Sequence, residues 1–383
     1  MNIIIIGPAH PLRGGIAALN ERLACQLLDE GHDVEIYSFS LQYPGLLFPG
    51  KTQFTDSEPP KNLKIFKAIN SINPFNWLRV GRQIKKKRPD IIIVRYWLPF
   101  MSPSTGTICR IARKNNHTKV IAITDNILPH ESRPGDRQLT RFFTKSVNGF
   151  VAMSKNVFDD LDIFISNQPK RLSPHPIYDH YGKSVPKSTA KEKLLLSPDY
   201  QCLLFFGFIR DYKGLDLLLE AISHDKIKSI DNLKLIIAGE FYSNEEKYLA
   251  LIKELGIEKN VILRTDYIAE DQVNLYFCAC DMVTQPYKTA TQSGVTQIGY
   301  HFNKPMLVTN VGGLPEIIED QKCGYVVNPD PESISNAISD FYTNNREGFM
   351  VNEVIKAKER FSWENFTKTI FDIYNTCNSS QKN

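Results

Sequence analysis

The fold is decided by the stretch of residues 282–309, MVTQPYKTATQSGVTQIGYHFNKPMLVT. Two apolar, strand-like runs at its ends, 282–286 and 305–309, enclose small polar residues and the start of a helix at Ser293 and Gly294. A strand, small polar residues and a helix form a recurrent phosphate-binding arrangement, because the first N–H groups of the helix have no partner within it. The helix dipole adds positive potential there. A loop that only precedes a helix has the same sequence pattern. The surrounding sequence decides between a phosphate-binding site and such a loop.

The length and charge of the chain predict two domains of opposite character. At 383 residues the chain is long for one domain, and its 42% hydrophobic and 23% charged residues are typical of a soluble globular protein. Residues 1–185 carry 25 Lys and Arg against 15 Asp and Glu, whereas the remainder carries 21 against 27. The first half is therefore expected to face something anionic.

Signals for export, membrane spanning and metal binding are missing from the sequence. The opening residues, MNIIIIGP, lack the positive charge and the long apolar run of a signal peptide. No apolar stretch approaches the roughly 18–20 residues that a membrane span needs. The seven cysteines are scattered without metal-ligand spacing, which is typical of buried reduced thiols. These features predict a cytoplasmic protein without a metal.

The first half opens as a doubly wound sheet. Residues 2–6 form a β-branched run, typical of a strand buried on both faces of a parallel sheet. A loop with Gly14 and Gly15, a helical stripe of apolar residues and a second strand at 34–38 follow. The adjacent glycines differ from the spaced G-x-G-x-x-G of a dinucleotide site, which disfavours a nicotinamide cofactor. They either let the backbone approach a phosphate or form a tight turn only.

A basic and aromatic segment comes next. Residues 61–88 contain nine basic residues and no acidic one, and Phe75 and Trp77 lie among them. This composition suits a helix on the surface of an anionic membrane. Lys and Arg near a helix C-terminus are equally explained by the helix dipole. A membrane contact through 61–88 and a solvated basic helix therefore both stay open.

Candidate acid–base groups follow a predicted buried strand at 119–124. Asp125, His130 and Glu131 lie beyond its carboxyl end, where parallel sheets place their ligands. They could supply a general base and the group that orients it. Alternatively, they cap the helix expected at 137–146. We assign His130 to function and leave Asp125 open between the two interpretations.

The second half reads as another doubly wound sheet after a Pro- and His-rich linker predicted at 169–186. Its buried strands are expected at 201–207, 233–239, 261–263, 282–286 and 305–309. Arg210 and Lys213 follow the first of these strands, where such sheets bind ligands, and can neutralise a diphosphate. A solvated loop is the alternative.

Taken in order, blocks along the chain resemble the retaining glycosyltransferases of the GT-B fold and family-4 type. The matching blocks, besides Gly14 and Gly15, are 206–216 (FGFIRDYKGLD), 236–240 (IIAGE), 276–286, 311–316 (VGGLPE) and 361–363 (FSW). None is decisive alone, but the ordered set spans nearly the whole chain.

This resemblance implies an α/β fold with two doubly wound, Rossmann-like domains facing across a cleft. An N-terminal acceptor-binding domain is expected at 1–180 and a C-terminal nucleotide-sugar-binding domain at 190–360. A C-terminal helix at 361–377 is expected to cross back to the first domain.

The resemblance also implies roles for single residues. Arg210 and Lys213 would hold the donor diphosphate and complete a catalytic set with His130 and Asp125. Backbone N–H groups near Ser293 would share the diphosphate, and the backbone near Tyr267 would meet the nucleobase. The implied donor site comprises Gly14, Gly15, Arg210, Lys213, Gly239, Glu240, Tyr267, Ile268, Gln292, Ser293, Gly294, Val295 and Gln297. No metal is needed if these cations and dipoles stabilise the departing diphosphate.

Two departures from the family pattern concern the sugar and the base. The paired glutamates of the family are replaced by Ala290 and Ile298, so Gln297 and Gln292 (or Thr291) are expected to take over contacts with the ribose and the sugar. The family often has His at the position of Asp125, and His130 can stand in for it.

The leading hypothesis is a hexosyltransferase that moves a sugar from a nucleotide-diphosphate sugar to a glycan or lipid-linked acceptor in surface polysaccharide synthesis. It would work in the cytoplasm or at the inner face of the cell membrane, without nucleic acid as a partner. A sugar-nucleotide epimerase of the same fold and a non-catalytic glycosyltransferase-like subunit are the alternatives. The retained cations and glycine-rich loops favour an enzyme over a structural subunit.

Overall fold

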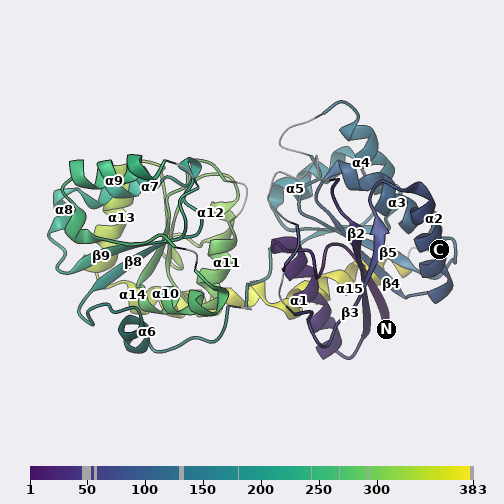
Figure 1. The fold of residues 1–383 in the computed structure, drawn as a ribbon, viewed down its shortest axis with the longest axis horizontal. Coiled ribbons are helices and arrows are strands. Elements are labelled where there is room, and N and C mark those ends of the chain that lie inside the picture. Colours follow the sequence, from purple (N-terminus) through teal and green to yellow (C-terminus); the bar gives the residue numbers. More distant parts are fainter. Residues whose placement is uncertain are drawn as a thin grey trace. The chain divides into compact units, whose positions relative to one another are not determined.

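The β-branched run near the start of the chain forms the strand β1, Asn2–Ile6. It lies at the point where the strand order of the first sheet reverses, because later strands are added on both sides of it. In the computed structural model the chain divides into two units, Met1–His175 with Trp363–Asn383 and Pro176–Ser362. Figure 1 shows a sheet with helices on both faces in each. The structure describes residues 1–44, 53–55, 58–128, 133–179, 181–242, 244–266, 268–290 and 293–379.

The first unit contains a parallel sheet of seven strands in the order β3-β2-β1-β4-β5-β6-β7. Its other strands are β2 Asp33–Leu41, β3 Lys64–Asn70, β4 Ile91–Tyr96, β5 Lys119–Thr124, β6 Gly149–Ala152 and β7 Lys170–Leu172. The central strands are buried on both faces, and the register pairs Ile3 with both Val34 and Ile91. Continuous apolar runs are stable only in such doubly covered strands.

Helices cover both faces of this sheet (Figure 1). They are α1 Gly15–Asp29, α2 Pro74–Lys87, α3 Ser102–Arg113, α4 Asp136–Thr144, α5 Lys155–Asp160 and α15 Trp363–Ser379, with 3₁₀ turns at Pro99–Met101 and Leu161–Ile163. The last helix, α15, packs against α1 and the strands β5, β6 and β7. It approaches β6 so closely that a Cβ added to Gly149 would lie 2.3 Å from Ile373. Trp363, which opens α15, is buried under the guanidinium of Arg22.

The second unit contains a parallel sheet of six strands in the order β10-β9-β8-β11-β12-β13. Its strands are β8 Gln201–Phe206, β9 Leu233–Ala238, β10 Val261–Arg264, β11 Met282–Gln285, β12 Met306–Thr309 and β13 Gly324–Val327. The chain builds from β8 outward to β10 and then returns to place β11 on the other side of β8. The carboxyl ends of β8 and β11 therefore form a topological switch point, the place where open α/β sheets bind ligands.

Alternate residues of the second sheet belong to two separate hydrophobic clusters, because side chains alternate between the faces of a strand. The helices that cover this sheet are α6 Lys187–Lys193, α7 Leu215–Ile222, α8 Asp225–Lys228, α9 Glu245–Glu254, α10 Val273–Ala279, α11 Gly294–His301, α13 Pro331–Thr343 and α14 Glu347–Lys358. Leu203 and Phe205 pack with α7, α8, α9 and α13, whereas Cys202 and Leu204 pack with α6, α10 and α11, and α14 contributes to both clusters. The shorter elements are α12 Leu314–Ile317, η4 Asp211–Lys213, η5 Glu258–Asn260, η6 Glu270–Gln272 and η7 Glu359–Phe361.

The predicted doubly wound architecture is confirmed, with differences at its edges. The expected linker at 169–186 is wrong in its first part, because Lys170–Leu172 pairs with β6 as the edge strand β7. The edge strands β3 and β13 were not predicted from the sequence. The strand β3 is half-exposed and β13 spans only four residues, so neither carries the long apolar run that marks a central strand.

Candidate functional site

At the switch point of the second unit, the loop after β8 and the loop after β11 are locked together. Gly214 has a φ of +67°, and a Cβ added to it would lie 2.0 Å from the carbonyl oxygen of Pro286. The N–H of Lys288 donates to the carbonyl of Tyr212 at 2.7 Å. Lys288 also pairs with Asp216 at 2.7 Å. Only glycine at 214 permits both this backbone conformation and this approach.

The locked loops bury the amine of Lys213. The side chain is 8% exposed, and its Nζ lies 5.7 Å from the ring centroid of Tyr287. Within the described ranges, no acidic side chain pairs with Lys213 or with Arg210. Burial, helped by the charge of Arg210, lowers the pKa of Lys213 to about 8. A buried cation without a counter-ion is unfavourable, so an anion bound at this position would be stabilising.

Arg210 lies at the rim of the same position. Its guanidinium stacks 4.0 Å from the ring centroid of Tyr242 and is exposed to solvent. The backbone there is fixed, because the N–H of Ile209 donates to the carbonyl of Glu240 at 2.9 Å. The loops after β8 and β9 thus hold Arg210 where it can reach an anion bound at Lys213.

Gly239 has a packing role in this structure. Its φ is +135°, and an added Cβ would lie 2.6 Å from the carbonyl oxygen of Gly207. Glu240, the next residue, is half-buried and offers its carbonyl to the loop after β8. Both residues therefore shape the loop that carries Arg210.

The N-terminus of α11 lies next to Lys213, with Tyr287 between them. Ser293 caps the helix, since its Oγ accepts the N–H of Val295 at 3.2 Å and lies 3.2 Å from the hydroxyl of Tyr287. Burial raises the pKa of Tyr287, which keeps the phenol neutral. The ring of Tyr178 lies against Gly294, where an added Cβ would be 2.9 Å from it.

Val295 is one of the predicted donor-site residues, and its N–H donates within the helix cap to Ser293 Oγ. N-cap side chains satisfy donors near the helix start in this way. The positive end of the helix and the backbone at Gly294 remain the available features at this point.

Two buried amides lie on the face of the sheet that α11 covers. Gln297 in α11 and Gln285 at the end of β11 are each 1% exposed. Neither the Nε2 nor the Oε1 atom of either side chain has a hydrogen-bond partner in the described part of the chain. Gln285 shares a strand face with Val283, which packs in the same cluster as Val295. Buried amides are normally satisfied, so both side chains have capacity for a polar ligand.

Gln297 was predicted from the sequence as a site residue, whereas Gln285 was not. The signal for Gln285 was a polar residue at the carboxyl end of a buried strand. Three predicted site residues, His130, Tyr267 and Gln292, lie outside the described residues. Ile268 packs at the edge of the hydrophobic cluster beneath α10 and α11.

In the first unit, Asp125 forms an ion pair with a residue of the neighbouring strand. Arg95 of β4 donates from Nε and Nη2 to the two carboxylate oxygens, each at 2.6 Å. Arg95 is 2% exposed, and its Nη1 has no partner among the described residues. The capping interpretation is wrong for Asp125, because Gly135 is the N-cap of α4. A carboxylate held through both oxygens by a guanidinium fits a positioning role better than that of a proton acceptor.

Gly14 and Gly15 form the exposed start of α1. Gly14 is the N-cap with a φ of +115°, and an added Cβ would meet nothing within 4 Å. The backbone conformation explains the glycine at 14, and open space surrounds it. Both glycines are exposed, and the choice between a phosphate contact and a simple turn stays a prediction.

None of the described helices combines the length and apolarity that crossing a bilayer requires.

Comparison with known proteins links both units to known families. Residues 13–173 match the family described as Glycosyltransferase Family 4, and residues 200–344 match the one described as Glycosyl transferases group 1. An uncharacterised glycosyltransferase of Methanocaldococcus jannaschii is 24% identical over 98% of both chains. The O-antigen chain mannosyltransferase C of Escherichia coli is 23% identical over 95% of this chain and 94% of its own.

Among solved structures, Anabaena HepE in complex with UDP has a similar fold. Its TM-score is 0.71 at 15% identity, with 98% of this chain and 100% of that chain covered. At this identity the likeness concerns the fold alone.

Proposed function

The chain belongs to the glycosyltransferases of the group 1 and family-4 type with the GT-B fold, and from this premise we propose that it is a retaining hexosyltransferase. Its donor would be a nucleotide-diphosphate sugar and its acceptor a glycan or lipid-linked intermediate of surface polysaccharide synthesis. One observation carries the proposal: the buried amine of Lys213 lies without a counter-ion beside the N-terminus of α11.

The donor diphosphate fits the charges at the switch point. Lys213 supplies a positive charge that the fold has already stripped of water, and Arg210 adds a guanidinium that can bind phosphate oxygens in a bidentate manner. The first turn of α11 adds partial positive charge. The negative charge of a nucleoside diphosphate would offset the free-energy cost of burying the Lys213 ammonium group.

The hydroxyl groups of the donor fit the two buried amides. Each of Gln285 and Gln297 has a free donor and a free acceptor, so each can bind a sugar or ribose hydroxyl in either sense. A glutamate at Ala290 or Ile298 would only accept hydrogen bonds. The replacement of the glutamates therefore supports a sugar-nucleotide donor whose hydroxyl groups are bound by these two amides.

In the proposed reaction, the acceptor hydroxyl attacks the anomeric carbon on the face that the diphosphate leaves. The new glycosidic bond forms as the bond to the diphosphate breaks, and the hydroxyl proton passes to the departing phosphate. Lys213 and Arg210 stabilise the negative charge that grows there. We propose that these cations and the helix dipole supply this stabilisation without a metal ion. Asp125 would position the loop that leads to His130.

A lipid-linked acceptor agrees with the exposed face of α2. Phe75 is 84% exposed and Leu78 37% exposed, and Arg79, Arg82 and Lys86 are exposed on the same helix. Apolar side chains with cations beside them are typical of helices that lie on anionic lipid. The O-antigen mannosyltransferase among the relatives supports an acceptor of surface polysaccharide type. We propose that this face contacts the membrane that carries the acceptor.

Titration with UDP, GDP and ADP, followed by thermal unfolding, tests the donor site. We expect one nucleotide to raise Tm, and we expect Arg210→Ala and Lys213→Ala each to weaken its binding at least about tenfold. Lys253→Ala, at an exposed lysine of α9, is the matched control and should bind like the wild type. Unchanged Tm with every nucleotide would overturn the proposal. A panel of sugar nucleotides, followed for transfer or hydrolysis, would then identify the sugar.

A further inference from the structure

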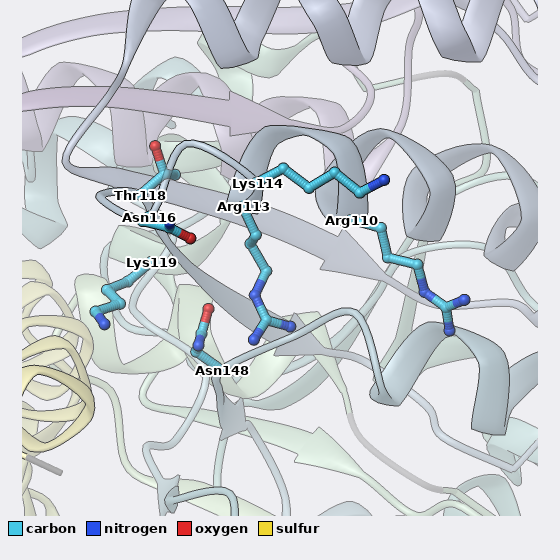
Figure 2. A pocket seen from close by; sticks show the side chains of 7 residues that line it. All are labelled: Arg110, Arg113, Lys114, Asn116, Thr118, Lys119 and Asn148. Atoms are coloured by element: carbon cyan, nitrogen blue, oxygen red, sulfur yellow. The ribbon is translucent and has the colours of Figure 1, made fainter. Parts of the chain in front are cut away.

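A pocket lined by four cations lies at the amino end of the first sheet, away from the strand ends that Asp125 follows. Its volume is 290 Å³. Arg110, Arg113 and Lys114 contribute from the last turn of α3 and the residue after it, and Lys119 from the start of β5. Figure 2 shows these side chains around the turn that joins the two elements. Neither the proposed transfer reaction nor the family comparisons make use of this pocket.

Arg110 is held firmly at one side of the pocket. Its Nε donates to Ser146 Oγ at 2.9 Å and its Nη2 to the carbonyl of Phe142 at 2.8 Å. The guanidinium also stacks 4.0 Å from the ring centroid of Phe142. A fixed guanidinium loses little entropy when it binds a ligand, which is the condition of a prepared site.

Arg113 and Lys114 are poorly compensated within the described residues. Arg113 makes one long hydrogen bond, from Nη1 to the carbonyl of Lys145 at 3.4 Å, and no carboxylate pairs with Arg110, Arg113 or Lys114 in the described residues. Lys119 is only 5% exposed. Burial lowers the pKa of Arg113 and of Lys119, and the nearby guanidiniums add to this effect. The positive charges therefore repel one another within the hollow.

Interaction with the helix dipole explains only part of this arrangement. Cations in the last turn of α3 gain stability from the dipole without any ligand. However, the dipole accounts neither for the hollow nor for a buried lysine on the adjacent strand. It also leaves unexplained the amide of Asn148, whose Oδ1 accepts the N–H of Val120 and whose Nδ2 remains to donate at the pocket wall.

We propose that this pocket binds a phosphate group, and that it is a second anion site in addition to the donor site. Two guanidiniums three residues apart on one helix face can share the oxygens of a tetrahedral anion, and the amide and lysines complete its shell. The volume admits a diphosphate as well as a single phosphate. The phosphate can belong to a free anion or to a lipid headgroup. The lipid alternative is open because Arg88 donates to the carbonyl of Asn115, which connects this turn to the basic end of α2, the helix proposed to lie on the membrane.

The test uses the full chain carrying Arg210→Ala and Lys213→Ala, which removes the donor-site cations from the measurement. Inorganic pyrophosphate should raise Tm of this double variant and bind in calorimetry. Adding Arg113→Gln and Lys114→Gln should weaken that binding at least about tenfold, because charge-assisted contacts are lost. Adding Arg137→Gln, at an exposed arginine of α4, should leave it unchanged. Comparing Tm of the unliganded variants shows that each remains folded.

Vesicles distinguish the two sources of phosphate. If the headgroup of phosphatidic acid is the ligand, phosphatidylcholine vesicles with phosphatidic acid should sediment the double variant even after Arg79, Arg82 and Lys86 of α2 are changed to Glu, and adding Arg113→Gln with Lys114→Gln should then release it. If a free anion is the ligand, pyrophosphate alone should bind in the manner described. Failure of both probes, or binding that survives these two substitutions, would overturn the proposal. The donor-site proposal would be untouched by that result.

Discussion

At the scale of single residues, Lys213 sets the balance between stability and binding. Its pKa is lowered to about 8 by burial, so the protein without ligand accommodates a charge that it does not solvate. Such conflicts between stability and function are typical of binding sites. The cost disappears if the amine is replaced by an apolar group of similar length.

We expect Lys213→Met to stabilise the unliganded protein by up to roughly 3 kcal/mol at pH 7 while it weakens nucleotide binding. The folded pKa lies below the unfolded value, so the cost is complete below pH 8 and fades as pH rises toward 10.5. Urea unfolding at pH 7 and pH 9.5 measures both values, with Lys253→Met as the control at an exposed lysine. A destabilised variant at pH 7 would contradict this expectation.

The same titration should appear in donor affinity. UDP-glucose is a suitable probe because its diphosphate does not titrate near pH 8. Its Kd should be constant below pH 8 and should rise up to about tenfold per pH unit above it, since free Lys213 loses its charge there. Calorimetry from pH 6.5 to 9.5 gives this profile. In Lys213→Met the rise should vanish, and a wild-type profile that stays flat would show that the amine does not contact the diphosphate.

At the scale of elements, the site depends on how the loop after β8 meets the loop after β11. The glycine at 214 makes this contact possible, and the N–H of Lys288 completes it. The strand ends themselves are placed by the sheet. The loops then decide whether Arg210 and Lys213 face the start of α11.

Gly214→Ala should therefore destabilise the protein by roughly 2–4 kcal/mol, because a left-handed φ and overpacking against Pro286 both add cost. It should also weaken nucleotide binding, since η4 has to shift. Gly348→Ala in α14 is the matched control: an added Cβ meets nothing within 4 Å, and a gain of about 0.5–1 kcal/mol is expected. Chemical unfolding compares the two. Equal stability of both variants would show that the loop contact is not tight.

At the scale of the whole molecule, the excess positive charge of the first half is concentrated on particular surfaces. Some cations of the basic segment are neutralised within the fold: Lys64 pairs with Asp33, and Lys87 pairs with Glu35. The exposed face of α2 and the pocket at the end of α3 retain their positive charge. The proposed membrane contact therefore concerns one helix face and not the entire basic half.

Changing Arg79, Arg82 and Lys86 to Glu should abolish sedimentation with phosphatidylglycerol vesicles, because the charge on the exposed face of α2 is reversed. Fold and nucleotide binding should persist, since these side chains are exposed. The variant with Arg113→Gln and Lys114→Gln is the control and should still sediment. Vesicle binding by the triple Glu variant equal to that of the wild type would refute the α2 contact.

The sequence by itself determined the doubly wound architecture and pointed to the strand ends at which the candidate site lies. Long β-branched runs are stable only in parallel strands that helices cover on both faces. The order of the central strands and of the glycine-rich loops could therefore be predicted from the sequence. Arg210 and Lys213 could be named because they lie in the loop after such a strand, and Ser293 because it lies between such a strand and the start of a helix. The edge strand at Lys170–Leu172 could not, because half-exposed strands lack this pattern.

Only the tertiary structure decided the state of the individual groups. Asp125 is held by Arg95 across two neighbouring strands, and Gln285 and Gln297 are buried without partners although they lie on different elements. The burial of Lys213 likewise depends on Tyr287 from another loop. Burial, pairing and pKa arise from contacts between distant segments, and local sequence patterns do not encode them.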